Sequence, residues 1–374
     1  LMTRLAGKTA KPMQPLALIL SPTRELAMQI SDVIAPLSRT VNLNSQVVAG
    51  GLSYSKQIQA LKRGVPIVVA TPGRLIDLIQ KKHIKLDDIS ITVLDEADQM
   101  ADMGFLPDVK RILDLTKPGG QRMLFSATLD RDVDSLVKKY LKNPMTHSLA
   151  NEKSTAGNMS HHVLILEQAH KDLITAQIAA RKGKSIFFVR TKHGADKLTK
   201  KMNEVGVAVG ALHGGKTQAQ RSRVLEAFKS GKTNALVATD VAARGIHVDD
   251  VSLVVHVDAP ENHKDYLHRA GRTARAGAVG TVVTLATHKQ RKGVHGLTAR
   301  AGVRLSESTV RPLDANLVRI TGAAEPSGIP IVLAGATKGE ESGRSDRYRG
   351  SRSRGGGKKK KSRPRPHERR KRPR

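Results

Sequence analysis

Cysteine and tryptophan are absent from the 374 residues, and only 2% of the residues are aromatic. The lack of cysteine excludes a disulfide scaffold, a zinc finger and a cysteine nucleophile, and it fits the reducing cytoplasm. The scarcity of aromatic rings argues against base stacking as the main way of binding nucleic acid. No apolar run approaches the ~20 residues that span a bilayer, so we expect no membrane segment.

Positive charge is abundant instead. The chain has 64 Lys and Arg residues against 33 Asp and Glu residues, a net charge of +31. Residues 338–374 alone hold 17 basic and 4 acidic residues and almost nothing to bury, which predicts a disordered basic tail. The charge favours a polyanionic partner, nucleic acid above all. A tail that only keeps the protein soluble is the alternative interpretation.

The first part of the chain, residues 1–149, alternates apolar strand-like runs with helical segments, as parallel α/β sheets do. Four of these runs end where a polar motif begins. The runs are Leu16–Leu20, Pro66–Ala70, Ile89–Leu94 and Met123–Phe125. Ligands of open α/β sheets gather beyond the carboxyl ends of the strands, so the four motifs predict one binding site.

The second part, residues 161–290, follows a polar linker at 150–160 and repeats the alternation. Its expected strands are Val163–Leu166, Ser185–Val189, Val207–Leu212, Asn234–Ala238, Val251–Val257 and Gly280–Leu285. Residues 291–337 are ambiguous. The predicted fold class is therefore α/β, with two tandem domains built on parallel sheets and the disordered tail after them.

Three carboxylates follow the apolar run that ends at Leu94. A buried strand delivers Asp95 to a fixed point, where Mg²⁺ with phosphate ligands can use it. Glu96, one residue later, can orient and deprotonate an attacking water. A negatively charged loop cap is the alternative for this segment, which continues to Asp98.

Two arginines in the second part, Arg272 and Arg275, are three positions apart and share one helical face. Two guanidinium groups on one face suit a γ-phosphate whose charge spreads in the transition state. Taken alone, this segment fits a solvated basic helix slightly better.

The motifs together resemble the DEAD-box family of ATP-dependent RNA helicases in superfamily 2, and its bacterial RhlE-like branch in particular. They occur in the family's order over residues 21–286. The matching segments are Pro22–Ala27, Gly50-Gly51, Thr71–Arg74, Asp95–Asp98, Ser126–Thr128, Ile186–Thr191, Gln218 with Arg221, Ala238–Asp240, Ala243–Gly245 and His268–Arg275. The resemblance implies two RecA-like domains that close on ATP and Mg²⁺ and unwind or remodel short RNA duplexes.

The resemblance also implies residue roles at the nucleotide. Asp95 would bind Mg²⁺ through water, and Glu96 would activate the hydrolytic water. Arg272 and Arg275 would act as arginine fingers. The other implied nucleotide-binding residues are Asp240, Gly245 and His247.

Further roles concern RNA and the coupling of its binding to ATP. The implied RNA-binding residues are Arg24, Gly51, Thr71, Gly73, Arg74, Gln218, Arg221, Thr239 and Arg244. The implied coupling residues are Asp98, Ser126, Thr128 and His268. Backbone contacts of this kind tolerate any RNA sequence. A cytoplasmic monomer is expected, with ribosome-assembly or RNA-decay complexes as candidate partners.

The sequence departs from the family before residue 21, where a glutamine motif and a phosphate-binding loop would precede the first matching segment. Gly7-Lys8-Thr9 does not supply that loop, because Met2 stands where the pattern needs glycine. The chain starts at Leu1 and is therefore expected to be an N-terminally truncated form that hydrolyses ATP negligibly. A non-catalytic RNA-binding or annealing protein is the alternative function.

Two smaller departures lie in the second part. His247 occupies a position where the family usually has Asp, and a histidine can still hydrogen-bond a ribose hydroxyl. Ala274 occupies a position where glycine is common, a change expected to be silent.

Removal of residues 338–374 is expected to weaken RNA binding and to flatten its salt dependence, because each basic side chain that neutralises a phosphate releases a counterion. The affinity for single-stranded RNA, measured at low and moderate salt with and without these residues, gives both quantities. Equal affinities and equal salt slopes would rule out the tail as an RNA tether.

Overall fold

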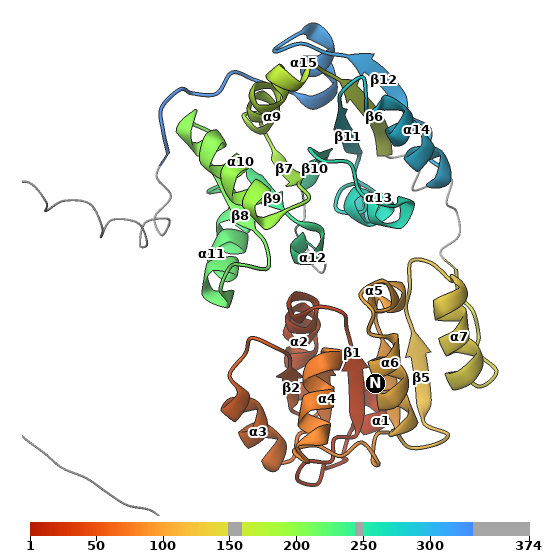
Figure 1. Cartoon of the computed structure of the whole chain (residues 1–374). Helices are drawn as coiled ribbons and strands as arrows, with labels where there is room; N and C mark the ends of the chain where they lie inside the picture. Colours follow the sequence, from red (N-terminus) through yellow and green to blue (C-terminus); the bar gives the residue numbers. More distant parts are fainter. Residues whose placement is uncertain (149–158, 244–247, 249, 332–374) are drawn as a thin grey trace, which may run out of the picture. The chain divides into compact units, whose positions relative to one another are not determined.

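The computed structural model describes residues 1–148, 159–243, 248 and 250–331 (Figure 1). The expected tail and residues 150–158 of the expected linker lie outside the described residues, as do Arg244, Gly245 and His247. Two parallel sheets form the described part, each with helices on both faces. None of the described helices combines the length and the apolar character that a membrane span requires.

The first sheet has five parallel strands in the order β2-β3-β1-β4-β5. They are β1 (Ala17–Leu20), β2 (Ser45–Val48), β3 (Ile67–Ala70), β4 (Ile91–Leu94) and β5 (Gln121–Leu124). The central strand, β1, pairs in register with both neighbours, so that Ala17 lies opposite Ile67 and Ile91. All carboxyl ends therefore meet at one edge of the sheet, where the polar motifs follow.

Helices cover both faces of this sheet because parallel strands need crossover connections. They are α1 (Met2–Leu5), α2 (Arg24–Arg39), α3 (Tyr54–Lys62), α4 (Pro72–Gln80), α5 (Ala97–Asp102), α6 (Leu106–Asp114) and α7 (Arg131–Tyr140). Alternate residues of β1 enter different cores. Ile19 packs with Leu5 and Ala27 of α1 and α2, while Leu18 packs with Leu75 of α4.

The second sheet has seven parallel strands in the order β12-β6-β11-β10-β7-β9-β8. They are β6 (Met159–Ile165), β7 (Lys184–Phe188), β8 (Val209–Leu212), β9 (Ala235–Ala238), β10 (Val251–His256), β11 (Gly280–Ala286) and β12 (Ser306–Thr309). Its helical segments are η1 (Gln168–His170), α9 (Lys171–Ala179), α10 (Lys192–Glu204), α11 (Gln218–Lys229), α12 (Asp240–Ala243), α13 (His263–Ala270), η2 (Arg275–Gly277), α14 (Arg291–Arg300) and α15 (Ala315–Thr321).

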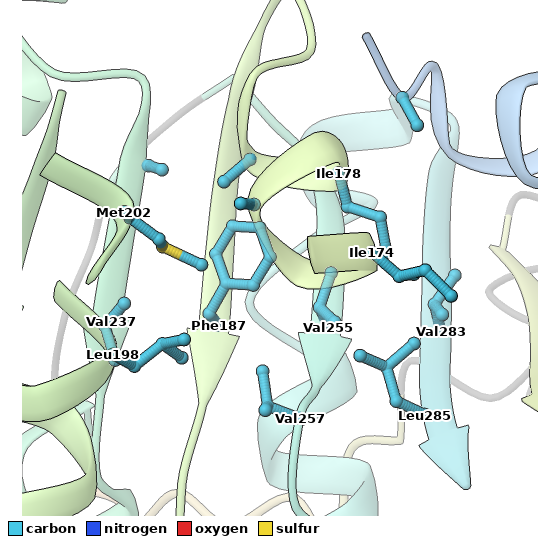
Figure 2. Packing of buried hydrophobic residues seen from close by; sticks show 14 of the residues in the cluster. Ile174, Ile178, Phe187, Leu198, Met202, Val237, Val255, Val257, Val283 and Leu285 are labelled. Carbon is cyan, nitrogen blue, oxygen red and sulfur yellow. The ribbon is translucent and has the colours of Figure 1, made fainter. Parts of the chain in front are cut away.

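One face of the second sheet is packed around Phe187, which is fully buried. Figure 2 shows its ring with Ile178 of α9 and Met202 of α10 nearby, and with Val255 on the neighbouring strand. The next residue, Phe188, points to the opposite face, where α11 to α14 supply the other core. The sheet is therefore buried on both sides, as its continuous apolar runs predict.

Side-chain caps start several helices just after strand ends. Thr23, Asp130, Thr191 and Asn262 each accept a backbone N–H from the first turn of α2, α7, α10 and α13. Thr217 begins α11 with a reciprocal capping box. Such caps satisfy amide groups that a helix start would otherwise leave without partners, and they fix where each helix begins.

All ten strands expected from the sequence are present, and their ends lie within four residues of the expected ends. Two strands were not expected, β2 and β12. The ambiguous segment after residue 290 contains α14, β12 and α15, and β12 extends the sheet by pairing with β6. Val310 and Leu317 pack in the same core as Phe187. The described part of this segment therefore belongs to the second domain.

Replacing Phe187 with Ala is expected to lower the free energy of unfolding by about 3–5 kcal/mol, because the cavity lies in a fully buried core. Urea unfolding followed by circular dichroism measures the change. Phe125→Ala is the matched control, since that side chain is 55% exposed. Equal losses for the two variants would show that the core around Phe187 is not packed as described.

Candidate functional site

Asp95 and Glu96 lie at the carboxyl end of β4. The backbone N–H of Asp95 donates to the carbonyl of Leu20 at 2.9 Å, which ties this end of β4 to β1. Burial raises the pKa of both carboxyl groups. For Asp95 the N–H of Glu96 opposes that rise, and for Glu96 the charge of Arg272 does so. Two adjacent carboxyl groups are thus held in a site that is partly shielded from water.

The backbone of Glu96 has φ 48° and ψ 55°, in the left-handed region. A residue with a β-carbon rarely adopts this conformation, and it costs roughly 1–2 kcal/mol. Strain of this kind persists where the surroundings over-determine it, and it concentrates at functional sites. The side-chain Oε2 of Glu96 is buried and has no hydrogen-bond partner among the described residues. The fold therefore maintains an unfavourable arrangement at this residue.

Asp98 connects the acidic segment to the end of β5. Its Oδ2 accepts from the N–H of Thr128 at 3.0 Å and from the Thr128 hydroxyl at 3.1 Å. The N–H of Asp98 donates to Ser126 Oγ, which in turn donates to the carbonyl of Thr128. His268 Nε2 lies 3.8 Å from Asp98 Oδ2. The four residues predicted to couple ATP to closure therefore form one cluster.

The pKa of Asp98 reflects these contacts. Burial acts to raise it, but His268 and the hydroxyl groups of Ser126 and Thr128 outweigh burial and lower the pKa to about 2. The carboxylate is therefore ionised near neutral pH.

Arg272 and Arg275 follow α13, and each returns a hydrogen bond to a backbone carbonyl four residues earlier. Arg272 Nε donates to His268 and Arg275 Nε to Gly271, at 3.1 and 3.0 Å. Burial and the charge of Arg275 lower the pKa of Arg272 to about 10, while Glu96 acts in the opposite direction. Glu96 and Arg272, predicted to act on the same phosphate, therefore influence each other's pKa.

A cavity of about 330 Å³ adjoins the arginines and is lined by Arg272, Arg275, Asp250 and Ser252, among others. This volume is in the range of small-molecule sites. The carboxylate of Asp240, a predicted nucleotide-binding residue, is held by two nitrogen atoms of the Arg269 guanidinium, at 2.5 and 2.8 Å.

The RNA candidates of the first domain lie on two turns. Arg24 donates to the carbonyl of Gly50 at 2.9 Å. Gly51 has φ 75°, a backbone conformation that favours glycine. The next turn begins with Thr71, which precedes α4.

Gly73, in the first turn of α4, has open space where a β-carbon would be. The guanidinium of Arg74 lies 5.0 Å from the Tyr54 ring centroid. This half-buried arginine and the bare glycine surface beside it suit a phosphate backbone, which needs charge and close approach.

Two RNA candidates of the second domain have protein partners in this structure. Arg221 is 5% exposed, and its Nε donates to Glu25 at 2.9 Å while Nη2 donates to the carbonyl of Ala242. Gln218 lies 4.0 Å from the sulfur of Met28. Both side chains contact α2 or its neighbours rather than an open surface. Thr239 is also buried, at 8% exposed, and its carbonyl accepts from α12.

A family model described as DEAD/DEAH box helicase matches residues 2–136, and one described as helicase conserved C-terminal domain matches residues 167–277. DEAD-box ATP-dependent RNA helicase 30 of Arabidopsis thaliana is 39% identical over 316 residues, covering 83% of this chain and 53% of that protein. ATP-dependent RNA helicase DBP2 of Saccharomyces cerevisiae is 40% identical over 287 residues, covering 75% and 52%. The chain belongs to the DEAD-box helicase family.

Solved DEAD-box structures agree with this fold. S. cerevisiae Dbp5 bound to RNA and ADP BeF3 matches with a TM-score of 0.72 and 28% identity, over 83% of this chain and 82% of that chain. Mss116 bound to ssRNA and UDP-BeF matches with a TM-score of 0.68 and 25% identity, over 84% and 68%. The expected pair of RecA-like domains is confirmed.

The DEAD-box chain spans about half the length of the relatives named above. Those relatives come from a plant and a yeast, so the bacterial RhlE-like branch stays a prediction.

Ala274, expected to be a silent change, adopts φ 54° and ψ 38° in this DEAD-box chain. This conformation explains why glycine suits the position: alanine must bear left-handed strain there. The substitution is therefore not silent for the backbone, and it falls between the two arginines.

The acidic residues fit Mg²⁺ as part of a larger ligand set. Within the described residues, no group of three or more His, Asp or Glu side chains could hold a metal ion by itself. Mg²⁺ commonly keeps waters and binds one or two carboxylates together with substrate phosphates. The buried, unpartnered Oε2 of Glu96 and the adjacent Asp95 provide hard oxygen atoms of that type.

Sequence reasoning missed Arg269, Glu25 and Lys264. Arg269 lies inside a recognised motif, yet its forked contact with Asp240 is a tertiary contact. Glu25 also lies inside a motif and pairs with a residue far along the chain. Lys264 lies one helical turn before His268, and this spacing was the available signal.

Glu96→Gly is expected to be more stable than Glu96→Ala by about 1 kcal/mol, because both lose the carboxylate and only glycine relieves the left-handed backbone. Chemical denaturation of the two variants measures the difference. Lys138, exposed on α7, supplies the control pair: Lys138→Gly should be less stable than Lys138→Ala. The same order at both positions would contradict strain at Glu96.

Proposed function

We propose that this chain carries the catalytic and RNA-binding parts of an ATP-dependent RNA helicase, which unwinds or remodels short RNA duplexes by ATP-driven closure. The observation that supports this most is the interaction of Glu96 with Arg272, each opposing the effect of burial on the other's pKa. They come from different domains, so a reaction that needs both depends on the domains meeting.

Glu96 is the proposed general base in ATP hydrolysis. Burial raises the pKa of its carboxyl group, which brings its basicity closer to that needed for accepting a proton from water near neutral pH. Asp95 would hold Mg²⁺ through water, and the ion would neutralise charge on the phosphates. Arg272 and Arg275 would stabilise the negative charge that develops on the transferred phosphoryl group.

Asp98, Ser126, Thr128 and His268 are the proposed coupling residues. A change at the nucleotide that moves the segment after β4 would also move the end of β5, because Asp98 is bonded to Thr128 through two hydrogen bonds. Through His268 the same carboxylate reaches α13. ATP binding and domain closure are thus linked by one ionised group.

RNA is the proposed partner. Arg24, Gly51, Gly73 and Arg74 would contact phosphates, which would make binding independent of sequence. The RNA-bound structures of Dbp5 and Mss116 support this. We propose that the protein acts as a monomer in the cytoplasm, with ribosome-assembly or RNA-decay complexes as its setting.

RNA binding is tested on the 374-residue chain by fluorescence anisotropy with single-stranded RNAs of different sequence. Arg74→Gln is expected to weaken all of them alike and to lower the salt slope by about 1. Arg111→Gln, an exposed residue of α6, is the matched control. Loss of affinity for one RNA sequence alone, or no salt dependence in the unaltered chain, would contradict phosphate recognition.

ATP hydrolysis is tested with a helicase phosphate-binding segment fused before Leu1, because residues 1–21 contain no such loop. Glu96→Gln is expected to lower the RNA-stimulated kcat by about 10²- to 10⁴-fold, and Arg272→Lys by at least about 10³-fold. Arg291→Lys, an exposed pair with Glu307, controls for the loss of a guanidinium. Full activity of both site variants would contradict the roles proposed for Glu96 and Arg272, whereas no RNA-stimulated hydrolysis by the unaltered fusion would leave only an RNA-binding or annealing protein.

A further inference from the structure

Lys264 lies on α13 outside the recognised motifs, and it contacts two carboxylates of the first domain. Its Nζ is 2.5 Å from Asp130 Oδ2 and 3.4 Å from Asp102 Oδ1. The three side chains are between 21% and 30% exposed, so water reaches them only in part. The ammonium group therefore has one acidic partner in α5 and a second one at the cap that precedes α7.

The spacing of these residues repeats that of the neighbouring pair. Asp98 and Asp102 are four positions apart on α5, and Lys264 and His268 are four positions apart on α13. Residues with this spacing lie on the same helical face. His268 lies 3.8 Å from Asp98, and Lys264 pairs with Asp102, so the two helices meet through two successive polar contacts.

Asp130 also caps α7, and this cap orients its side chain for the contact with Lys264. Its Oδ1 caps α7 by accepting the N–H groups of Asp132 and Val133, both at 3.0 Å. Its Oδ2 is left for Lys264. The hydrogen bond with Asp130 raises the pKa of Lys264, and although burial acts to raise the pKa of Asp130, the lysine lowers it overall. Both groups are therefore stabilised in their charged forms.

We propose that Lys264 is a positioning residue, which with Asp102 and Asp130 forms a clip that holds α13 against the segments following β4 and β5. Arg272 is eight positions after Lys264, just beyond the same helix, so the clip sets where its guanidinium lies relative to Glu96. The effect on hydrolysis rests on the proposed function, whereas the effect on the separation of the domains rests on the contacts alone.

The alternative is a partly exposed ion pair that has no effect on closure. Many exposed pairs change an equilibrium by nothing measurable, and the others change it by roughly 1.5- to 5-fold. The clip is expected to belong to the second group, because a single ammonium group contacts two carboxylates and one of them is fixed by its cap. Its loss is therefore expected to shift the closure equilibrium by about two- to five-fold.

The absence of cysteine allows a direct test, since two introduced cysteines are the only ones to label. Lys117→Cys and Lys232→Cys place labels on exposed sites before β5 and β9. Single-molecule energy transfer then measures the separation of the domains in the 374-residue chain, without nucleotide or RNA. Lys264→Met is expected to lower the ratio of short to long separations by about two- to five-fold, and Lys264→Arg is expected to preserve it.

Lys138→Met is the matched control. Lys138 pairs with Asp134 inside α7, and its replacement by methionine removes the same charge. It is expected to leave the ratio unchanged. Added salt should lower the ratio in the unaltered chain and have little effect in Lys264→Met. An unchanged ratio in Lys264→Met, or an equal shift in Lys138→Met, would overturn the clip.

Asp130→Asn separates the clip from the cap, since asparagine caps helices as well as aspartate does. If Lys264 acts through Asp130, then Lys264→Met should have a smaller effect in the Asp130→Asn background than in the unaltered chain. Fully additive effects would place the action of Lys264 elsewhere. Neither ATP nor RNA is present in this measurement. A lower ratio in Lys264→Met would therefore support the clip even if the helicase proposal failed, and an unchanged ratio would not contradict the helicase proposal.

Discussion

The site depends on two opposite charges, each of which opposes the effect of burial on the other's pKa. Removal from water favours the protonated form of Glu96 and the deprotonated form of Arg272, and each counteracts that tendency in the other. Proximity to Arg272 therefore favours the carboxylate form of Glu96, whereas Arg272, with a pKa of about 10, stays charged at neutral pH. Chemistry that needs a carboxylate beside a guanidinium depends on an arrangement of the chain in which the two groups are close, and the remaining contacts favour that arrangement.

Several polar contacts contribute to that selection. Asp98 joins the acidic segment to the end of β5, and Arg269 fastens α13 to Asp240. Arg221, itself an RNA candidate, forms a buried pair with Glu25. A buried pair of this kind contributes little net stability, but removal of one partner leaves a costly unpaired charge. These pairs thus specify geometry more than they stabilise the fold.

Most of the fold could be predicted from the sequence, because a strand that is buried on both faces consists of a continuous run of apolar residues. The two unexpected strands, Ser45–Val48 and Ser306–Thr309, are short, and both are edge strands that are only partly buried, so they lack a continuous apolar run. Motif order identified the acids and arginines. It could not identify the partner of Arg221, since Glu25 is distant in sequence, nor the role of Lys264, which no motif includes.

The backbone at Glu96 bears on which residues this position can accept. Glycine or asparagine would occupy the left-handed conformation at lower cost, so the backbone alone does not favour glutamate there. If the carboxylate served no purpose, either of these residues would relieve the strain. A glycine at the corresponding position of a related chain would therefore be expected to go with loss of the proposed general base.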